Sequence, residues 1–305
     1  MSTGVRHETR TIALDGRCRP TLTPFGVFPR NPTHRWAPRS FANAVWTPAG
    51  PGTVAFTWTS GSVDVEAWGE GATWLLDAAP RWLGSHDDPS GFDPTPNARL
   101  ADLWRQHGPF RLGASGVVWQ HLLFTIVGQR VTTQEAVRAW REMVTEWGEP
   151  APGPFGLTLA PSPETVASRS YVDFHHFGIE RSRATTMIAA ARSAHRLERA
   201  ASMDSDAALR HLMHVPGIGP WTATSTLTAS IGDPDIVVER DYGLPTMVVW
   251  AFTGDATRQL DDTRMFELLE PFRPHRQRVV RLLFAAGVSP PRRAPRARNP
   301  RIAWL

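Results

Sequence analysis

The sequence contains no lysine, so all 33 of its basic residues are arginines. Arginine stays protonated and offers a planar fork of N–H donors to phosphate or carboxylate groups. It has no amine that can act as the nucleophile of a Schiff base. Lyase chemistry that depends on a lysine side chain is therefore excluded by composition.

Cysteine is almost absent, because the only one is Cys18. One thiol cannot form an internal disulfide or supply the four cysteine ligands of an iron–sulfur cluster or a zinc site. We therefore expect no iron–sulfur cluster. The pair His175-His176 has no third ligand at a useful spacing, so we expect it to be structural rather than metal-binding.

Long apolar runs are also missing. No stretch approaches the roughly 18 to 20 uncharged apolar residues that a membrane helix needs, and residues 1–17 lack the apolar core of a signal peptide. With 41% apolar and 20% charged residues, the composition is typical of a globular protein. We expect a soluble, cytoplasmic protein that makes no membrane contacts.

Changes in composition divide the chain into four parts. Residues 1–40 are rich in Arg, Pro and Thr, and we expect a partly ordered arm. In residues 41–92, short alternating runs between glycine-containing turns predict a small antiparallel sheet, followed by a helix over 72–83. Residues 93–288 are predicted to be helical almost throughout. Residues 289–305 form a basic tail, which is either solvated or in contact with phosphates.

Apolar residues recur at helical spacing through the larger part of the chain. Helices are predicted over 117–129, 133–147, 181–197, 206–213, 220–230, 263–269 and 273–286. The fold expected from this pattern is mainly α, with a small N-terminal α/β domain that contains an antiparallel sheet.

The most informative segment is VPGIGPWTA, over residues 215–223, between two predicted helices. Gly217 and Gly219 allow a tight turn that brings bare backbone close to a ligand, and Pro220 suits the first position of the next helix. The amides at such a helix start can bind a phosphate oxygen without reading a base. A turn of this kind can also be a plain helix connection, and what favours the phosphate interpretation is the carboxylate of Asp241, some twenty residues later.

Further segments carry a resemblance to a known family: IVGQRVTT over residues 126–133, residues 233–244 ending in ERDYGL, and PFRPHR over residues 271–276. Together with the 215–223 turn, they make the chain similar to the helix-hairpin-helix DNA glycosylases over about residues 98–288. Within that superfamily the sequence resembles the 3-methyladenine glycosylase II branch. The resemblance implies a two-lobed helical core and a monomeric, nucleoid-associated bacterial enzyme of base excision repair that binds duplex DNA containing damaged bases.

The resemblance places Asp241 at the position of the family's catalytic aspartate. Breaking an N-glycosidic bond develops positive charge on the sugar, and an ionised carboxylate can stabilise this charge and orient or deprotonate water. Asp241 also stands at a predicted helix start, where aspartate is a common N-cap, and the two roles are compatible. Asp233, Asp235 and Glu239 are the competing acids; the first two are typical of a turn, and the third is expected to be solvated or paired with an arginine.

Glycosylases turn the target nucleotide out of the duplex into a pocket, and a protein side chain usually fills the gap. The resemblance implies a base pocket formed by Trp221, Ser225, Tyr242, Gly243 and Phe284. It implies contacts with the DNA backbone from Gly217, Ile218, Gly219 and Thr222. It also implies that Gln129 or Arg130 either fills the gap in the duplex as a wedge or makes a further contact with the DNA backbone. The turn could also hold a Na⁺ or K⁺ ion through the main-chain carbonyls of Met213, Val215 and Ile218, and no other cofactor is expected.

Trp221 stands where bifunctional relatives carry their Schiff-base lysine, in agreement with the absence of lysine. We therefore predict a monofunctional glycosylase that removes an alkylated purine, such as 3-methyladenine or 7-methylguanine. Such a base is already cationic before the bond breaks and needs little acid catalysis to leave, so one carboxylate suffices. Two alternatives stay open: a non-catalytic helix-hairpin-helix DNA-binding protein, and a glycosylase for oxidised or deaminated purines. Ser225 and Gly243 replace bulkier side chains, which favours a roomier pocket.

Overall fold

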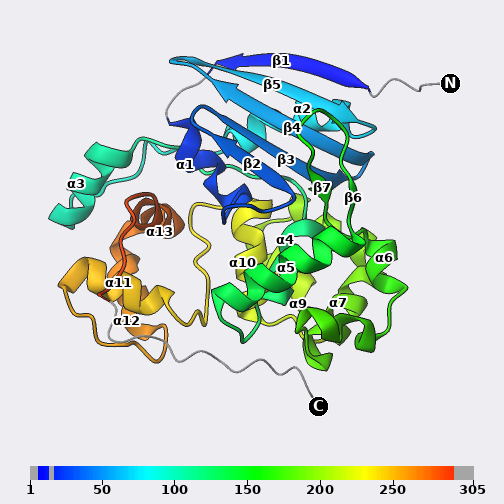
Figure 1. Ribbon diagram of the computed structural model, residues 1–305. Coiled ribbons are helices and arrows are strands. Elements are labelled where there is room, and N and C mark those ends of the chain that lie inside the picture. The colour runs from blue at the N-terminus through cyan, green and yellow to red at the C-terminus, as the bar shows by residue number, and fades with distance from the viewer. Residues whose placement is uncertain (1–5, 14–16, 292–305) are drawn as a thin grey trace.

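A five-stranded antiparallel sheet with one helix across it forms the N-terminal part of the molecule (Figure 1). The computed structural model describes residues 6–13 and 17–291. The strand order is β1 (His7–Ala13), β5 (Ser62–Gly69), β4 (Gly50–Trp58), β3 (Ser40–Thr47) and β2 (His34–Ala37). Helix α2 (Ala72–Trp82) packs on β1, β4 and β5, where alternate residues such as Val54, Phe56, Val63 and Val65 are fully buried.

Residues 7–37, which the sequence assigns to a partly ordered arm, supply both edge strands of this sheet. β1 pairs along its whole length with β5, and β2 pairs with β3. Between them, α1 (Cys18–Leu22) and the 3-10 turn η1 (Thr23–Phe25) bury Leu22 and Phe25 in the same core. An edge strand is exposed along much of its surface, so the segment HETRTIA lacks the apolar alternation that reveals the central strands. The small domain therefore begins well before residue 41.

The first helical lobe follows the sheet. It contains α4 (Trp119–Val127), α5 (Thr133–Trp147), α6 (Pro163–Ala167), α7 (Arg181–Arg192), α8 (Ala194–Leu197), α9 (Ser205–Met213) and α10 (Pro220–Ser230). The lobe also includes the strands β6 (Glu149–Pro150) and β7 (Thr158–Leu159) and the 3-10 turns η2 (Tyr171–Phe177) and η3 (Glu198–Ser202). One apolar core runs through α4, α5, α7, α9 and α10. The predicted helix over 181–197 is interrupted at Ser193, between α7 and α8.

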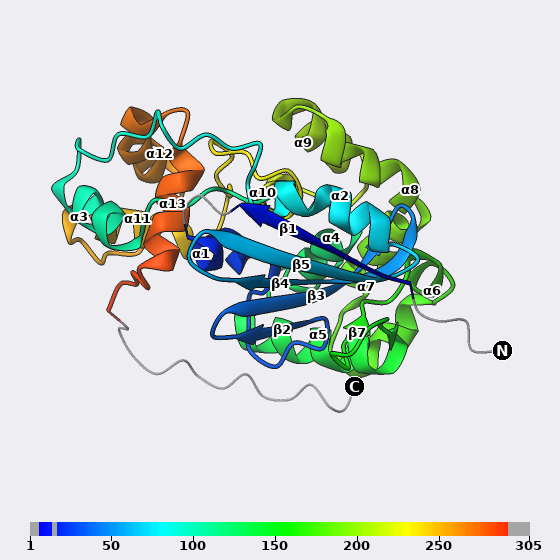
Figure 2. The ribbon, with the colours of Figure 1, turned by 90° about the horizontal axis from the view of Figure 1, so that it is seen from above.

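The second lobe has its own core. It combines α3 (Ala98–His107), which comes before the first lobe in the sequence, with α11 (Leu244–Thr253), α12 (Thr263–Leu269), η4 (Glu270–Phe272) and α13 (Arg276–Ala285). α3 and α13 lie side by side in both views of the ribbon (Figures 1 and 2). Neither α3 nor α11 is among the helices predicted from the sequence.

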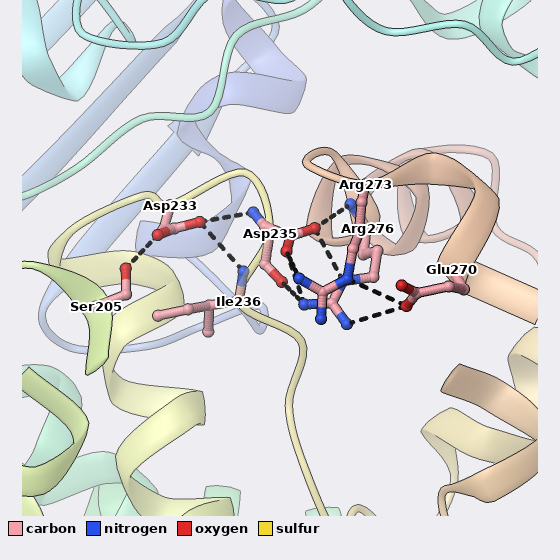
Figure 3. Close-up of polar contacts among 7 residues, drawn as sticks. All are labelled: Ser205, Asp233, Asp235, Ile236, Glu270, Arg273 and Arg276. Carbon is pink, nitrogen blue, oxygen red and sulfur yellow. Dashed lines mark hydrogen bonds and ion pairs between the residues drawn. The ribbon is translucent and has the colours of Figure 1, made fainter. Parts of the chain in front are cut away.

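An extended segment over residues 232–243 connects the two lobes. Ile236 is buried in the core of the first lobe and Val237 in that of the second. Asp233 accepts hydrogen bonds from the amides of Asp235 (2.6 Å) and Ile236 (3.3 Å) and from the Ser205 hydroxyl, and Asp235 accepts from Nε (2.9 Å) and Nη2 (2.7 Å) of Arg276 (Figure 3). This segment is therefore fastened to both lobes before it reaches Asp241.

The described residues contain neither a helix suited to cross a membrane nor a cluster of metal-ligating side chains. No helix in this part of the chain combines the length and the apolar character needed to cross a membrane. No group of three or more His, Cys, Asp or Glu side chains within it is placed to hold a metal ion. Residues 292–305 of the predicted basic tail lie outside the described residues.

Candidate active site

The turn between α9 and α10 is anchored on one side and open on the other. Val215 and Ile218 are buried in the core of the first lobe. Gly217 has a φ of +89°, and a Cβ atom added there would lie 2.0 Å from Oγ1 of Thr186 on α7. A Cβ atom at Gly219 would meet nothing within 4 Å. The turn thus requires glycine at position 217 for packing, while position 219 leaves its backbone accessible to a ligand.

Helix α10 begins at this open position. Its N-cap is Gly219, no side chain caps it, and Pro220 occupies the first turn. The amides of an uncapped first turn carry partial positive charge and need an acceptor, which a phosphate oxygen can supply. This geometry agrees with the backbone contact expected from residues 217–222.

The Asp241 side chain joins α10 to the start of α11. Its Oδ1 accepts hydrogen bonds from the amides of Gly243 (2.8 Å) and Leu244 (2.7 Å), and its Oδ2 accepts one from the indole Nε1 of Trp221 (2.9 Å). Asp241 is partly buried, as is Trp221. Three N–H donors therefore fix the orientation of the carboxylate, which holds the helix start and contacts the tryptophan of the hairpin at the same time.

The loop after α4 lies against this tryptophan. A Cβ atom at Gly128 would lie 3.6 Å from Cη2 of Trp221. Nε2 of Gln129 donates to the Gly217 carbonyl (3.0 Å) and to Oγ1 of Thr222 (2.9 Å). Arg130 follows, with an exposed side chain and a φ of +57°. The structure therefore brings together Gly217, Thr222, Trp221, Gln129 and Asp241.

The other predicted pocket residues lie in different surroundings. Tyr242 is 67% exposed, and the Arg258 guanidinium lies 4.1 Å from its ring centroid. Ser225 is partly buried on α10, and a side chain at Gly243 would meet only Oδ1 of Asp241, 3.8 Å from its Cβ. Phe284, on α13 in the second lobe, is 54% exposed. Of these residues, only Gly243 belongs to the hydrogen-bonded group around Asp241, through its main-chain amide. The place of all four in a base pocket stays a prediction.

The main-chain carbonyls proposed for a monovalent cation lie at the same turn. The Val215 carbonyl accepts a hydrogen bond from the amide of Ile218 (3.1 Å). Within the described residues, the carbonyls of Met213 and Ile218 accept none, so they can serve as oxygen ligands. The donor set is chemically suitable for Na⁺ or K⁺, which take neutral oxygen ligands without a carboxylate.

Three residues that contact the site, two arginines and a threonine, were not predicted, because no motif or pattern near them in the sequence indicates this role. Arg183 on α7 is 4% exposed and donates to the carbonyls of Val127 (2.7 Å) and Gly178 (2.9 Å), and burial lowers the pKa of its guanidinium. Thr186 packs against Gly217, and Arg258 covers Tyr242. Apart from the bond between Arg183 and Gly178, which are five residues apart, each of these contacts joins residues that are distant in the sequence, and periodicity carries no information about such pairs.

The sequence of the chain is similar to that of a candidate DNA-3-methyladenine glycosylase of Bacillus subtilis. The two are 25% identical over 167 residues, which cover 53% of this chain and 55% of that protein, so the chain spans about half the length of this curated relative. No protein-family model matches the chain.

Two solved structures share nearly the whole fold. A 3-methyladenine DNA glycosylase from Archaeoglobus fulgidus superposes with a TM-score of 0.74 at 19% identity, covering 91% of this chain and 98% of that one. An 8-oxoguanine glycosylase/lyase of Clostridium acetobutylicum in complex with double-stranded DNA gives 0.67 at 11% identity, covering 93% and 97%. The resemblance to 3-methyladenine DNA glycosylases and the expected fold, a helical core with a small N-terminal sheet domain, are both confirmed.

Proposed function

We propose that the chain is a DNA glycosylase of base excision repair that hydrolyses the N-glycosidic bond of an alkylated purine, with Asp241 as its essential carboxylate. The observation that carries this proposal is the hydrogen bond from Trp221 Nε1 to Asp241 Oδ2, 2.9 Å long. Trp221 is the second residue of the helix that starts at the phosphate-binding turn. One helix start therefore holds the DNA backbone and positions both the aromatic ring and the carboxylate.

The proposed reaction needs only one carboxylate and water. As the bond between C1′ and the purine nitrogen breaks, its electron pair moves to the base, and the sugar becomes an oxocarbenium cation that Asp241 stabilises. Water adds to C1′ and transfers a proton to the carboxylate. The products are the free base and an intact abasic site. A 3-methyladenine or 7-methylguanine base carries a positive charge before cleavage and leaves as a neutral molecule, so no general acid is required.

The aromatic side chain next to the carboxylate supports a cationic base. Trp221 offers an electron-rich ring, and such rings attract cations by about 0.5 to 2 kcal/mol. Its position also supports monofunctional chemistry, because this chain has a tryptophan where bifunctional relatives carry their lysine, and the sequence contains no lysine. Borohydride treatment during turnover should therefore trap no side-chain adduct with DNA.

Replacing Asp241 tests the proposal directly. The Asp241→Asn variant should fold and bind DNA, because the amide oxygen can still accept from the main-chain amides of Gly243 and Leu244, with the loss of the acceptor for Trp221 Nε1. It loses the charge that stabilises the sugar cation. We expect release of 3-methyladenine and 7-methylguanine from methylated DNA, measured by chromatography, to fall by about 10³-fold or more. Glu239→Gln, two residues earlier, is the matched control and should retain activity. Release near the wild-type rate by Asp241→Asn would refute the assignment.

The same assay separates the two alternative functions. Salt-sensitive DNA binding without release of any base would support a protein that only binds DNA. Release from duplexes that carry 8-oxoguanine or hypoxanthine, in preference to methylated purines, would support a glycosylase for oxidised or deaminated bases.

A further inference from the structure

We propose that Gln129 is a positioning residue that fastens the loop after α4 to the phosphate-binding turn, and that only Arg130 of this pair contacts DNA. The inference rests on the proposed function, because it assigns a role in binding an extruded nucleotide. It differs from the expectation that either residue could be the wedge.

Both hydrogen bonds of the Gln129 amide are made within the protein. Nε2 donates to the Gly217 carbonyl at 3.0 Å and to the Thr222 hydroxyl oxygen at 2.9 Å. A main-chain carbonyl can only accept, so the NH₂ group of the amide has to face the turn. To enter the duplex, Gln129 would have to give up both bonds, the exposed one to the Gly217 carbonyl and the partly buried one to the Thr222 hydroxyl. Losing the second costs free energy, because Thr222 is buried and water cannot readily replace the donor.

The two acceptors flank the segment that would hold the phosphate. Gly217 is the residue with positive φ that packs on Thr186, and Thr222 is 3% exposed in the first turn of α10. Gly219, where an added Cβ would meet nothing, lies between them. The Gln129 amide therefore spans the phosphate-binding turn and fixes the distance between its two sides.

Three consecutive residues of the loop that carries Gln129 are held by contacts with other elements. Arg183 holds the Val127 carbonyl at 2.7 Å, Gly128 lies against Trp221, and Gln129 holds the turn. Arg130 comes next, exposed and with a left-handed φ of +57°. A non-glycine residue keeps this conformation only where its surroundings fix it, at a cost of order 1 kcal/mol. These three contacts supply the surroundings that fix the conformation of Arg130, and its side chain is exposed to solvent.

This group continues to the candidate catalytic residue. Trp221, which contacts Gly128, donates its indole N–H to Asp241. Gln129 thus links two contacts with DNA: that of Arg130 with a distorted duplex and that of the turn with a phosphate. The link lies next to the Trp221 ring and the Asp241 carboxylate. We expect the link to matter most for DNA in which a nucleotide is already extruded.

A double-mutant cycle tests the link through binding, without relying on base release. The variants are Gln129→Leu, Thr222→Val and the double variant, and the probes are an undamaged duplex and one containing a tetrahydrofuran abasic-site analogue. We expect each single variant to bind the analogue duplex about tenfold more weakly, and the double variant to bind no more weakly than Gln129→Leu. If Gln129 instead inserts into DNA, it acts independently of Thr222, so the losses of Gln129→Leu and Thr222→Val should add in the double variant. Additive losses overturn the proposal, as does a Thr222→Val variant that binds like the wild type.

Two controls separate this link from a general loss of structure. Thr222→Ser retains the hydroxyl and should bind like the wild type; a loss equal to that of Thr222→Val would overturn the proposal even if both variants fold less well. Gln134→Leu, at an exposed glutamine of α5, should change nothing. Failure of Asp241→Asn to lose base release would refute the catalytic assignment alone, whereas additive losses in the cycle would refute only the role of Gln129.

Discussion

Four acidic residues lie between positions 233 and 241, and hydrogen-bond partners distinguish their roles. Asp233 is bound by two amides and the Ser205 hydroxyl, and Asp235 by Arg276 and Arg273 (Figure 3). Asp241 is bound by the start of α11 and by Trp221. The structure makes Gly243, not Asp241, the N-cap of α11, but the Asp241 carboxylate accepts from the amides of Gly243 and Leu244 at that helix start and contacts Trp221 of the hairpin at the same time.

The two glycines of the 215–223 turn have different roles. Gly217 is required for packing against Thr186, whereas Gly219 leaves its backbone accessible to a ligand. We expect Gly217→Ala to lower the free energy of unfolding by about 2 kcal/mol or more, since it adds strain at a positive φ to a clash with Thr186. Chemical denaturation measures the change.

Gly219→Ala is the matched variant, because its φ of −101° suits any residue and its Cβ would meet no atom. It should keep the wild-type stability within about 0.5 kcal/mol but bind undamaged duplex DNA more weakly, as the methyl group would cover the backbone that we propose contacts a DNA phosphate. Equal stability losses in the two variants would show that the turn does not have one packed and one open side.

At the scale of elements, α4 is the helix on which the loop of Gln129 and Arg130 depends, and both of its ends are held by side chains from other elements. Glu198 of η3 accepts hydrogen bonds from the amides of Val118 (2.8 Å) and Trp119 (2.7 Å) at the start. Arg183 of α7 holds the Val127 carbonyl at the end. Burial raises the pKa of Glu198, against the effect of the two amides, which lower it.

Loss of the cap on α4 should therefore be costly. Glu198→Ala leaves two amides of the first turn without their acceptor in a largely buried place, and we expect the free energy of unfolding to fall by about 1 to 3 kcal/mol. The control is Glu164→Ala at the exposed first turn of α6, which should change stability by less than about 0.5 kcal/mol. Equal melting temperatures for Glu198→Ala and the wild type would contradict this role.

At the scale of the whole molecule, a buried ion pair holds the last helix to the segment that leaves the small domain. Arg278 on α13 donates to both oxygens of Asp87, at 2.6 and 3.0 Å, and both side chains are fully buried. The pair also binds backbone, since Arg278 donates to the Phe110 carbonyl (3.1 Å) and Asp87 accepts from the Leu112 amide (2.7 Å). Segments from three distant parts of the sequence meet at this pair.

Breaking this pair should affect the entire fold. Arg278→Met leaves the Asp87 carboxylate buried without its partner, and we expect a loss of about 3 to 5 kcal/mol in the free energy of unfolding. Arg264→Met, which removes an exposed pair with Glu267, should cost less than about 1 kcal/mol. Adding Asp87→Leu to Arg278→Met should recover part of the loss, and a double variant less stable than Arg278→Met would contradict the explanation.

The sequence by itself determined the chemistry that is available and most of the helices. The absence of lysine, the two glycines of the 215–223 turn and the aspartate that follows are visible without coordinates. The helix over 133–147, which has one apolar face, and the helix over 220–230, which begins at Pro220, have the predicted bounds. Helix α11 was missed because the segment LPTMVVWAFT is apolar on nearly every side, and a helix buried all around shows no amphipathic period.

Only the tertiary structure decided how the side chains are partnered. It paired His7–Ala13 with β5, bound Asp235 to Arg276 and placed the Gln129 amide on the turn at Gly217. The physical reason is common to all three. Periodicity and propensity reflect contacts between near neighbours in the chain, whereas a polar side chain is satisfied by whichever donor or acceptor folding brings within about 3 Å, however far away it lies in the sequence.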